Sequence, residues 1–193
     1  MVIESKTQII SCPKSGRTWL KVMYNKAICE EFGFSDKIIF SAEMLEGFPS
    51  ISWTHEQSDY VNSRISYKDL SVDKSDYKDD NVFMLRRNFK DAIVSGFFET
   101  TCRRRAYGGP TQESKKICAA STLGSLKDFI KSDVFGVKKL IRFYEIWHEN
   151  QSVPAKFEIL RYEEMHEDPE KSFRKFLKFL DVSILSEDRK SVV

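Results

Sequence analysis

Residues 9–20 read IISCPKSGRTWL, an apolar run followed by a short polar turn and the start of a helix. A strand, a tight turn and a helix in this order are typical of an α/β fold, and the junction directs several backbone N–H groups at one spot. The helix dipole adds positive potential there, Lys14 adds a full charge, and Ser15 and Thr18 add hydroxyl donors. The segment predicts a P-loop-like phosphate-binding turn, although an ordinary turn with a solvated Lys14 fits the local sequence equally well.

The turn differs from a Walker A loop, whose GxxxxGK[ST] pattern places the lysine after the second glycine. Here Lys14 precedes Gly16, the only glycine of the turn. A nucleoside-triphosphate enzyme also needs an Asp at a strand end to hold Mg²⁺, and no convincing candidate is found. A P-loop-type nucleotide kinase therefore remains an alternative, and magnesium dependence would distinguish it.

Beyond this turn, short β-like runs alternate with helical stretches, which predicts one central parallel sheet flanked by helices. The expected strands are Gln8–Cys12, Ile38–Phe40, Ile51–Thr54, Asn81–Leu85 and Lys156–Leu160. The expected helices are Thr18–Glu31, Lys90–Thr100, Leu126–Ser132, Val137–Asn150 and Glu170–Leu180, with Pro169 at the start of the last. Residues 56–80 are expected to be loop with some helix, residues 103–116 a surface loop, and the chain end the start of one more short helix.

The composition is that of a globular protein. The chain has 193 residues, of which 41% are hydrophobic and 31% charged. A chain of this length normally forms one domain with a sizeable core, and this composition excludes wholesale disorder and fibrous structure. We therefore expect a single α/β domain over residues 1–193.

Membrane, export and metal-binding signals are missing from the sequence pattern. No apolar run is long enough to cross a bilayer, and the opening MVIESKTQII contains no apolar signal region. The cysteines form no CxxC pair and have no histidine at ligand spacing; they are Cys12, Cys29, Cys102 and Cys118. We expect reduced thiols, no metal site, no membrane partner and a cytoplasmic location.

Charge is segregated along the chain. Nine acidic and four basic residues lie between positions 43 and 80, whereas eight basic and three acidic residues lie between positions 86 and 116. The net charge of only +2 argues against a bulk polyanion such as nucleic acid as a partner. The Arg-rich run at residues 103–105 is expected to be a solvated loop, with an anion-attracting lid as the less favoured interpretation.

A second segment with anion-binding chemistry spans residues 85–95, LRRNFKDAIVS. The predicted strand ends in Arg86 and Arg87, and Ser95 follows two helical turns later. A guanidinium at a strand end and a helix hydroxyl can converge on one phosphate, because Arg supplies a planar fork of donors. Taken alone, a solvated basic turn and a small packed serine would explain the same residues.

Together the two segments resemble motifs of the cytosolic-type sulfotransferase family. PKSGRTW at residues 13–19 is similar to the family's PKSGTTW-like loop, and RNFKDAIVS at residues 87–95 is similar to its RNPKDxxxS-like segment. LRYEEMHEDPEKSFRKFLKFL at residues 160–180 is similar to a third segment, LSYEDMKEDP. Arg17 and Phe89 replace the usual Thr and Pro, and of the family's late RKGxxGDWK-like segment only Arg189 and Lys190 could be a remnant.

The resemblance implies a binding site for 3′-phosphoadenosine 5′-phosphosulfate (PAPS) that needs no metal. Lys14 would contact the bridging oxygen and the leaving phosphate. The 5′-phosphate would be held by Ser15, Gly16, Arg17 and Thr18. Trp19 would stack on adenine with Tyr162 near the base, and Arg87 and Ser95 would bind the 3′-phosphate.

A base for the acceptor is also required, and the family has a histidine in a similar context between its two nucleotide motifs. Of the three histidines, His55 in ISWTHEQ follows a short apolar run, whereas His148 and His166 have the pattern of exposed helix or loop residues. The resemblance implies that His55 deprotonates the acceptor, and an imidazole suits this role. We expect sulfuryl transfer to the hydroxyl, or as a second choice the amine, of a small molecule or glycan; a non-catalytic nucleotide-binding protein of the same fold is the alternative.

Overall fold

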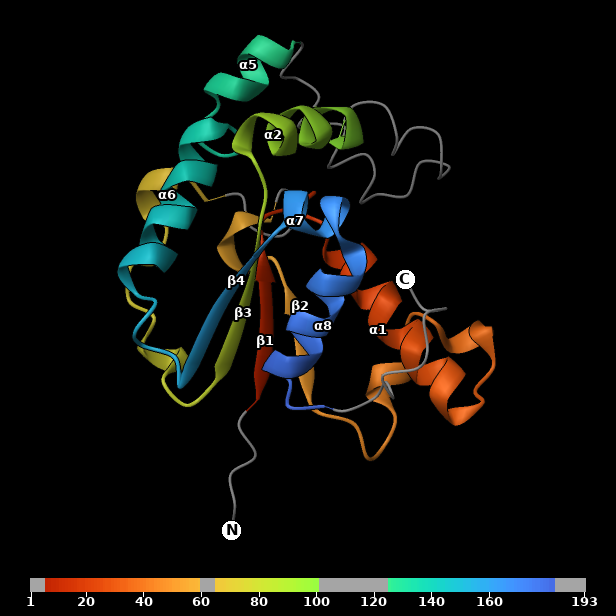
Figure 1. The fold of residues 1–193 in the computed structure, drawn as a ribbon. Helices are drawn as coiled ribbons and strands as arrows, with labels where there is room; N and C mark the ends of the chain where they lie inside the picture. The colour runs from red at the N-terminus through yellow and green to blue at the C-terminus, as the bar shows by residue number, and fades with distance from the viewer. Residues whose placement is uncertain (1–5, 60–64, 101–124, 183–193) are drawn as a thin grey trace.

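The computed structural model describes residues 6–59, 65–100 and 125–182. Within them, four parallel strands form one sheet in the order β2-β1-β3-β4 (Figure 1). The strands are β1 (Thr7–Ser11), β2 (Ile51–Thr54), β3 (Asn81–Arg86) and β4 (Lys156–Arg161). The expected α/β architecture with a central parallel sheet is confirmed.

The two central strands are buried on both faces. Ile9 of β1 lies in register with Phe83 of β3, and both belong to the core on one side of the sheet. Their neighbours Ile10 and Met84 are also in register and belong to the core on the other side. Continuous apolar runs are the expected sequence of strands that are covered on both faces by helices.

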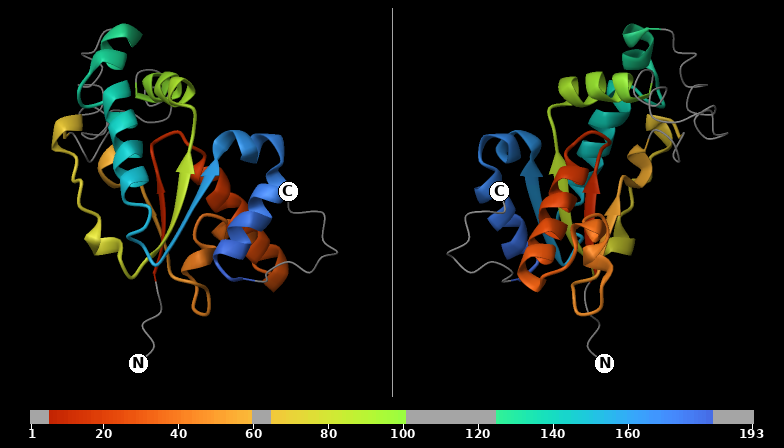
Figure 2. Two further views of the ribbon diagram at one scale, coloured as in Figure 1. Left: turned by 60° about the vertical axis from the view of Figure 1, so that its left-hand side comes forward. Right: turned by 90° about the vertical axis from the view of Figure 1, so that its right-hand side faces the viewer.

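Helices cover both faces of the sheet (Figure 2). One face carries α1 (Arg17–Phe32), α7 (Tyr162–Glu167) and α8 (Pro169–Phe179), and the other carries α2 (Phe89–Phe98), α5 (Leu126–Lys131) and α6 (Val137–Glu149). Helix α2 lies across the carboxyl ends of the strands (Figure 1). The loops that follow β1, β2 and β3 therefore meet at the edge of the sheet where α2 begins.

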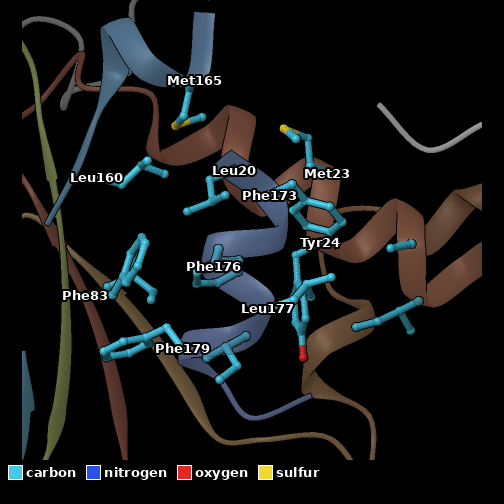
Figure 3. Packing of buried hydrophobic residues seen from close by; sticks show 14 of the residues in the cluster. Leu20, Met23, Tyr24, Phe83, Leu160, Met165, Phe173, Phe176, Leu177 and Phe179 are labelled. Carbon is cyan, nitrogen blue, oxygen red and sulfur yellow. The ribbon is translucent and has the colours of Figure 1, made fainter. Parts of the chain in front are cut away.

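Aromatic packing holds α1 and α8 against the sheet (Figure 3). Phe176 of α8 contacts Tyr24 of α1 with ring centroids 5.7 Å apart, and it contacts Phe83 of β3 at 5.1 Å. Phe179 also lies against Phe83, at 4.9 Å. Each such pair contributes about 0.5–1.5 kcal/mol beyond the area it buries. This core fixes the axis of α1, and hence the direction in which its N-terminus points.

One expectation about the elements was wrong, and one helix was not predicted. In place of the predicted strand Ile38–Phe40, Ile38 ends the 3₁₀ turn Asp36–Ile38 and the next two residues continue as a turn. The Ser35 side chain accepts a hydrogen bond from the Lys37 N–H and starts the turn there. The position beside β1 is occupied by β2. Helix α7 was not expected as a separate element, since its six residues are too few to show a helical period.

Other expectations lie partly outside the described residues. Residues 56–80 contain the 3₁₀ turns Glu56–Ser58, Tyr67–Asp69 and Ser75–Tyr77, as the expected loop with some helix implies. The expected loop over residues 103–116, the expected helix at the chain end, and Arg189 and Lys190 lie outside the described part. In that part, no helix is long and apolar enough to cross a membrane.

Candidate active site

The turn between β1 and α1 has a backbone that only particular residues can adopt. Lys14 has a φ of 69° and Gly16 a φ of 92°, so both are left-handed. A Cβ atom on Gly16 would lie 2.8 Å from Cδ2 of Tyr162, which makes glycine necessary there. The Gly16 carbonyl accepts the Leu20 N–H at 3.0 Å and begins α1. The positive φ of Lys14 costs about 1 kcal/mol or more, and such strain concentrates at functional sites.

Arg87 connects the end of β3 to this turn. Its Nη1 donates a hydrogen bond to the Lys14 carbonyl at 2.9 Å, and its guanidinium carbon lies 4.2 Å from the ring centre of Tyr162. Its Nε is buried and, among the described residues, has no hydrogen-bond partner. A buried donor in this state is costly, so the site suits a ligand that brings acceptor oxygens. A phosphate group fits the planar guanidinium fork.

The position of this contact follows from the strand order. The chain leaves β1 towards β2 on one side and returns to β3 on the other side of β1. At such a switch point the loops after the two neighbouring strands diverge and leave a crevice for a ligand at their carboxyl ends. The Lys14 turn follows β1 and Arg87 follows β3, so the two predicted anion-binding segments lie next to each other.

The side-chain hydroxyl of Tyr144 in α6 contacts both of these segments. The hydroxyl oxygen lies 3.4 Å from Oγ of the buried Ser15 and accepts the Arg87 N–H at 3.4 Å. Burial raises the pKa of Tyr144 well above its ordinary value, so the hydroxyl stays protonated. The helical period of 137–150 indicates that Tyr144 points inward, but the partners of its hydroxyl depend on the tertiary packing.

Lys14 contacts a residue that lies outside the two predicted anion-binding segments. Its Nζ lies 3.1 Å from Oε2 of Glu99, which follows the last turn of α2. Glu99 comes four residues after Ser95, and helical spacing places both on one face of α2. That spacing could have identified Glu99 as a neighbour of the site.

The structure places the other predicted nucleotide-binding residues in α1, α2 and α7. Trp19 contacts Tyr162 edge to face, with ring centroids 6.0 Å apart. Thr18 is exposed in the first turn of α1, and Ser95 is half-buried in α2. No hydrogen bond joins Ser95 to Arg87 within the described segments, so the expected convergence of these two side chains stays a prediction about the liganded state.

His55 lies directly after β2, beside the end of β1. Its Nδ1 is 2.8 Å from the Ser11 carbonyl oxygen. A carbonyl can only accept, so Nδ1 carries the proton and Nε2 keeps its lone pair. Burial and, to a smaller extent, the positive charge of Arg17 lower the pKa of His55 to about 4, against the opposing effects of the Ser11 carbonyl and Asp59. The ring is therefore neutral at physiological pH and can accept a proton at Nε2.

Buried polar contacts fix the position of the segment that follows His55. Glu56 accepts a hydrogen bond from Lys74 Nζ at 2.6 Å and another from Trp147 Nε1 at 2.8 Å. The Ser58 hydroxyl donates to the His55 carbonyl at 2.6 Å. These contacts hold the backbone of residues 55–58, and thus fix where the imidazole can lie.

The remaining histidines and the cysteines do not form a site. His148 and His166 are exposed on α6 and α7, as expected from their sequence context. Cys12 and Cys29 are buried free thiols, while Cys102 and Cys118 lie outside the described residues. Burial raises the pKa of the Cys12 thiol to about 12. In the described segments, no group of three or more His, Cys, Asp or Glu side chains could hold a metal ion.

Comparisons with known proteins identify the family and the fold. The family model for the sulfotransferase domain matches residues 4–193. Among curated protein sequences, none matches this chain. The crystal structure of mouse sulfotransferase SULT7A1 complexed with PAP is similar in fold, with a TM-score of 0.54 and 22% sequence identity over 95% of this chain. The match covers 61% of that protein, so this chain spans less than two thirds of its length.

A second solved structure, the sulfotransferase domain from the curacin biosynthetic pathway, is also similar. It has 11% sequence identity and a TM-score of 0.47, and the match covers 98% of this chain and 80% of that domain.

Proposed function

The chain belongs to the sulfotransferase domain family, and we propose that it transfers a sulfuryl group from PAPS to the hydroxyl of a small molecule or glycan. The observation that carries this proposal is the Arg87 contact. Its guanidinium is bound to the Lys14 turn, and its Nε is buried without a partner among the described residues. An anionic ligand placed between these two segments would receive donors from both. The SULT7A1 structure was determined with PAP, which supports a related nucleotide here.

The proposed reaction breaks the bond between sulfur and the oxygen that bridges it to the 5′-phosphate. A new bond forms between sulfur and the acceptor oxygen, and the acceptor proton moves to Nε2 of His55. The leaving group is adenosine 3′,5′-bisphosphate (PAP). Lys14 stabilises the negative charge that gathers on the bridging oxygen, since preorganised charge at that atom lowers the barrier most effectively.

The remaining residues hold the donor in line with the acceptor. Backbone N–H groups and side chains of residues 15–18 bind the 5′-phosphate, where Arg17 adds a cation. Trp19 and Tyr162 bind the adenine. Arg87 binds the 3′-phosphate, and Ser95 donates to the same group once the nucleotide is present.

The test is transfer of ³⁵S from labelled PAPS to a panel of phenols and sugars. His55→Gln is expected to lower kcat about 100-fold or more, the typical contribution of a general base, while calorimetry shows unchanged PAP binding. His148→Gln is the matched control, because His148 is exposed on α6, and it should keep full activity. Lys14→Ala should lower kcat as well.

Three results would contradict the proposal. Full activity of His55→Gln would show that another group is the base. PAP binding without transfer to any acceptor would indicate a nucleotide-binding protein that lacks turnover. Absence of ³⁵S transfer together with Mg²⁺-dependent phosphoryl transfer from ATP would favour the kinase alternative.

A further inference from the structure

Tyr144 places a buried hydroxyl between the two predicted phosphate-binding segments. Its oxygen lies 3.4 Å from Oγ of Ser15 in the Lys14 turn, and it accepts the Arg87 N–H at 3.4 Å. Tyr144 is 9% exposed and Ser15 is fully buried. Bulk water therefore does not decide the hydrogen bonds of these two hydroxyls. The neighbouring protein groups and any bound ligand decide them.

The Arg87 contact determines how the Tyr144 hydroxyl can bond. The Arg87 N–H donates, so the Tyr144 oxygen accepts there and its one proton must go to another acceptor. Between Tyr144 and Ser15, either hydroxyl could be the donor. A phosphate offers acceptor oxygens, so a phosphate at the Lys14 turn takes the proton of the Ser15 hydroxyl. The Tyr144 proton can then go to Ser15 Oγ, and the hydrogen bonds all run in one direction from Arg87 to the phosphate.

Without a ligand this chain of hydrogen bonds is weak. The thiol of Cys12 is a second acceptor for the Tyr144 proton, although sulfur accepts only weakly. Both 3.4 Å contacts of the Tyr144 hydroxyl are longer than the usual hydrogen bond, which is at most about 3.2 Å. A phosphate selects one direction for the protons, and hydrogen bonds that run in one direction polarise and strengthen one another.

Arg87 links the same chain of hydrogen bonds to the other phosphate of the nucleotide. Its Nη1 donates to the Lys14 carbonyl at 2.9 Å, and its main-chain N–H donates to Tyr144. Under the proposed function the guanidinium binds the 3′-phosphate. A bound 3′-phosphate would therefore fix Arg87, and with it the donor end of the chain that leads to Ser15.

We propose that Tyr144 is a positioning residue that couples the two phosphate subsites, so that the 3′-phosphate of the donor strengthens the binding of its 5′-phosphate. The inference rests on the proposed function, since it needs the nucleotide to lie between Arg87 and the Lys14 turn. Coupling of this kind is reciprocal, so each phosphate raises the affinity for the other by the same factor.

The test is a cycle of two proteins and two nucleotides. Tyr144→Phe removes the hydroxyl and keeps the ring, which lies 5.3 Å from the Arg86 guanidinium. Calorimetry gives Kd for PAP and for adenosine 5′-monophosphate (AMP), which lacks the 3′-phosphate. The variant should bind PAP about tenfold and AMP about threefold more weakly, as expected for the loss of one or two hydrogen bonds. The ratio of Kd for AMP to Kd for PAP should thus fall about threefold, whereas a merely structural role of Tyr144 would leave it unchanged.

Tyr24→Phe is the matched control. Tyr24 is also fully buried, and in the described part of the chain its hydroxyl has no hydrogen-bond partner. Its ring packs against Phe176 of α8. Tyr24→Phe makes the same chemical change in the core, and it should leave both dissociation constants and their ratio as in the unmodified protein.

Ser15→Ala tests the other end of the chain, and it decides the question if Tyr144→Phe does not unfold cooperatively in urea. It should lower the AMP-to-PAP ratio by a similar factor. The double variant Ser15→Ala, Tyr144→Phe should have a ratio no lower than that of Ser15→Ala, because a chain of hydrogen bonds can be broken only once.

The proposal is overturned if Tyr144→Phe or Ser15→Ala weakens PAP and AMP equally, or if Tyr24→Phe lowers the ratio as much as Tyr144→Phe does. Failure of the proposed function gives a different result. In that case the unmodified protein binds PAP no better than AMP, or binds neither nucleotide, and both proposals fail together.

Discussion

The imidazole Nδ1 of His55 lies 2.8 Å from the main-chain carbonyl oxygen of Ser11, the last residue of β1. This contact assigns the proton of the neutral ring to Nδ1 and leaves Nε2 as the basic atom. The same strand end leads into the turn that carries Lys14. The base and the cation of the proposed reaction are therefore positioned by one strand, although they are 41 residues apart in the chain.

Stability should depend on pH through His55. Its folded-state pKa of about 4 lies below the ordinary value of 6.5, so the unfolded chain binds more protons between these values. The neutral His55 ring makes its full contribution to the free energy of unfolding above pH 6.5, and this contribution is lost as the pH falls towards 4. The loss is at most about 3 kcal/mol, because solvent screens the exposed edge of the ring. Urea unfolding at several pH values would measure it.

The comparison for this prediction is His55→Gln. Glutamine does not titrate, so the variant should lose the part of the pH slope that His55 contributes between pH 6.5 and pH 4. Equal slopes for the two proteins would show that His55 titrates normally in the folded state.

Arg87→Ala should weaken PAP binding more than about tenfold, or roughly 1.4 kcal/mol, by calorimetry. The variant removes a guanidinium that stacks on Tyr162 and donates to the Lys14 carbonyl. Arg87→Lys should bind PAP little better than Arg87→Ala, because an ammonium group lacks the planar fork of donors. Arg86→Ala removes the same charge from an exposed neighbour, and it should bind PAP almost normally. Equal losses in both variants would mean that only net charge matters.

Gly16→Ala should destabilise the protein and abolish PAP binding. The added Cβ meets two obstacles, a φ of 92° and the Tyr162 ring at 2.8 Å. Gly47→Ala is the matched control, since Gly47 has a φ of 93° but nothing lies within 4 Å of its Cβ position. We expect about 1–2 kcal/mol for Gly47→Ala from the backbone alone, and a clearly larger loss of unfolding free energy for Gly16→Ala. Similar losses would argue against the Tyr162 contact.

Lys74→Met should cost about 3–5 kcal/mol of unfolding free energy, because it leaves the carboxylate of Glu56 buried and without its cation. Lys74 is only 3% exposed and lies 2.6 Å from Glu56. The double variant Glu56→Gln, Lys74→Met should recover much of the loss. Lys78→Met, at a 71% exposed side chain whose partner Asp79 lies 4.0 Å away, should have almost no effect. A small loss for Lys74→Met would mean that water compensates Glu56.

Much of the fold could be predicted from the sequence because its signals are local. The apolar runs of β1 and β3 and the periodic apolar positions of α1, α6 and α8 reflect burial that repeats along each element. Ile38–Phe40 was misassigned because three apolar residues are too few to separate a strand from a turn. The two anion-binding segments were recognisable since each carries its donors within a dozen residues.

The sequence by itself thus determined the elements of an α/β sheet, and it predicted which residues bind phosphate. Only the tertiary structure decided which of them meet. The strand order brings the Lys14 turn to Arg87, the packing of α6 brings the Tyr144 hydroxyl between them, and the end of α2 brings Glu99 to Lys14. The residues joined by these contacts are separated by 57 to 129 positions in the sequence. No local period encodes such pairs, because they depend on how separately formed elements pack into one core.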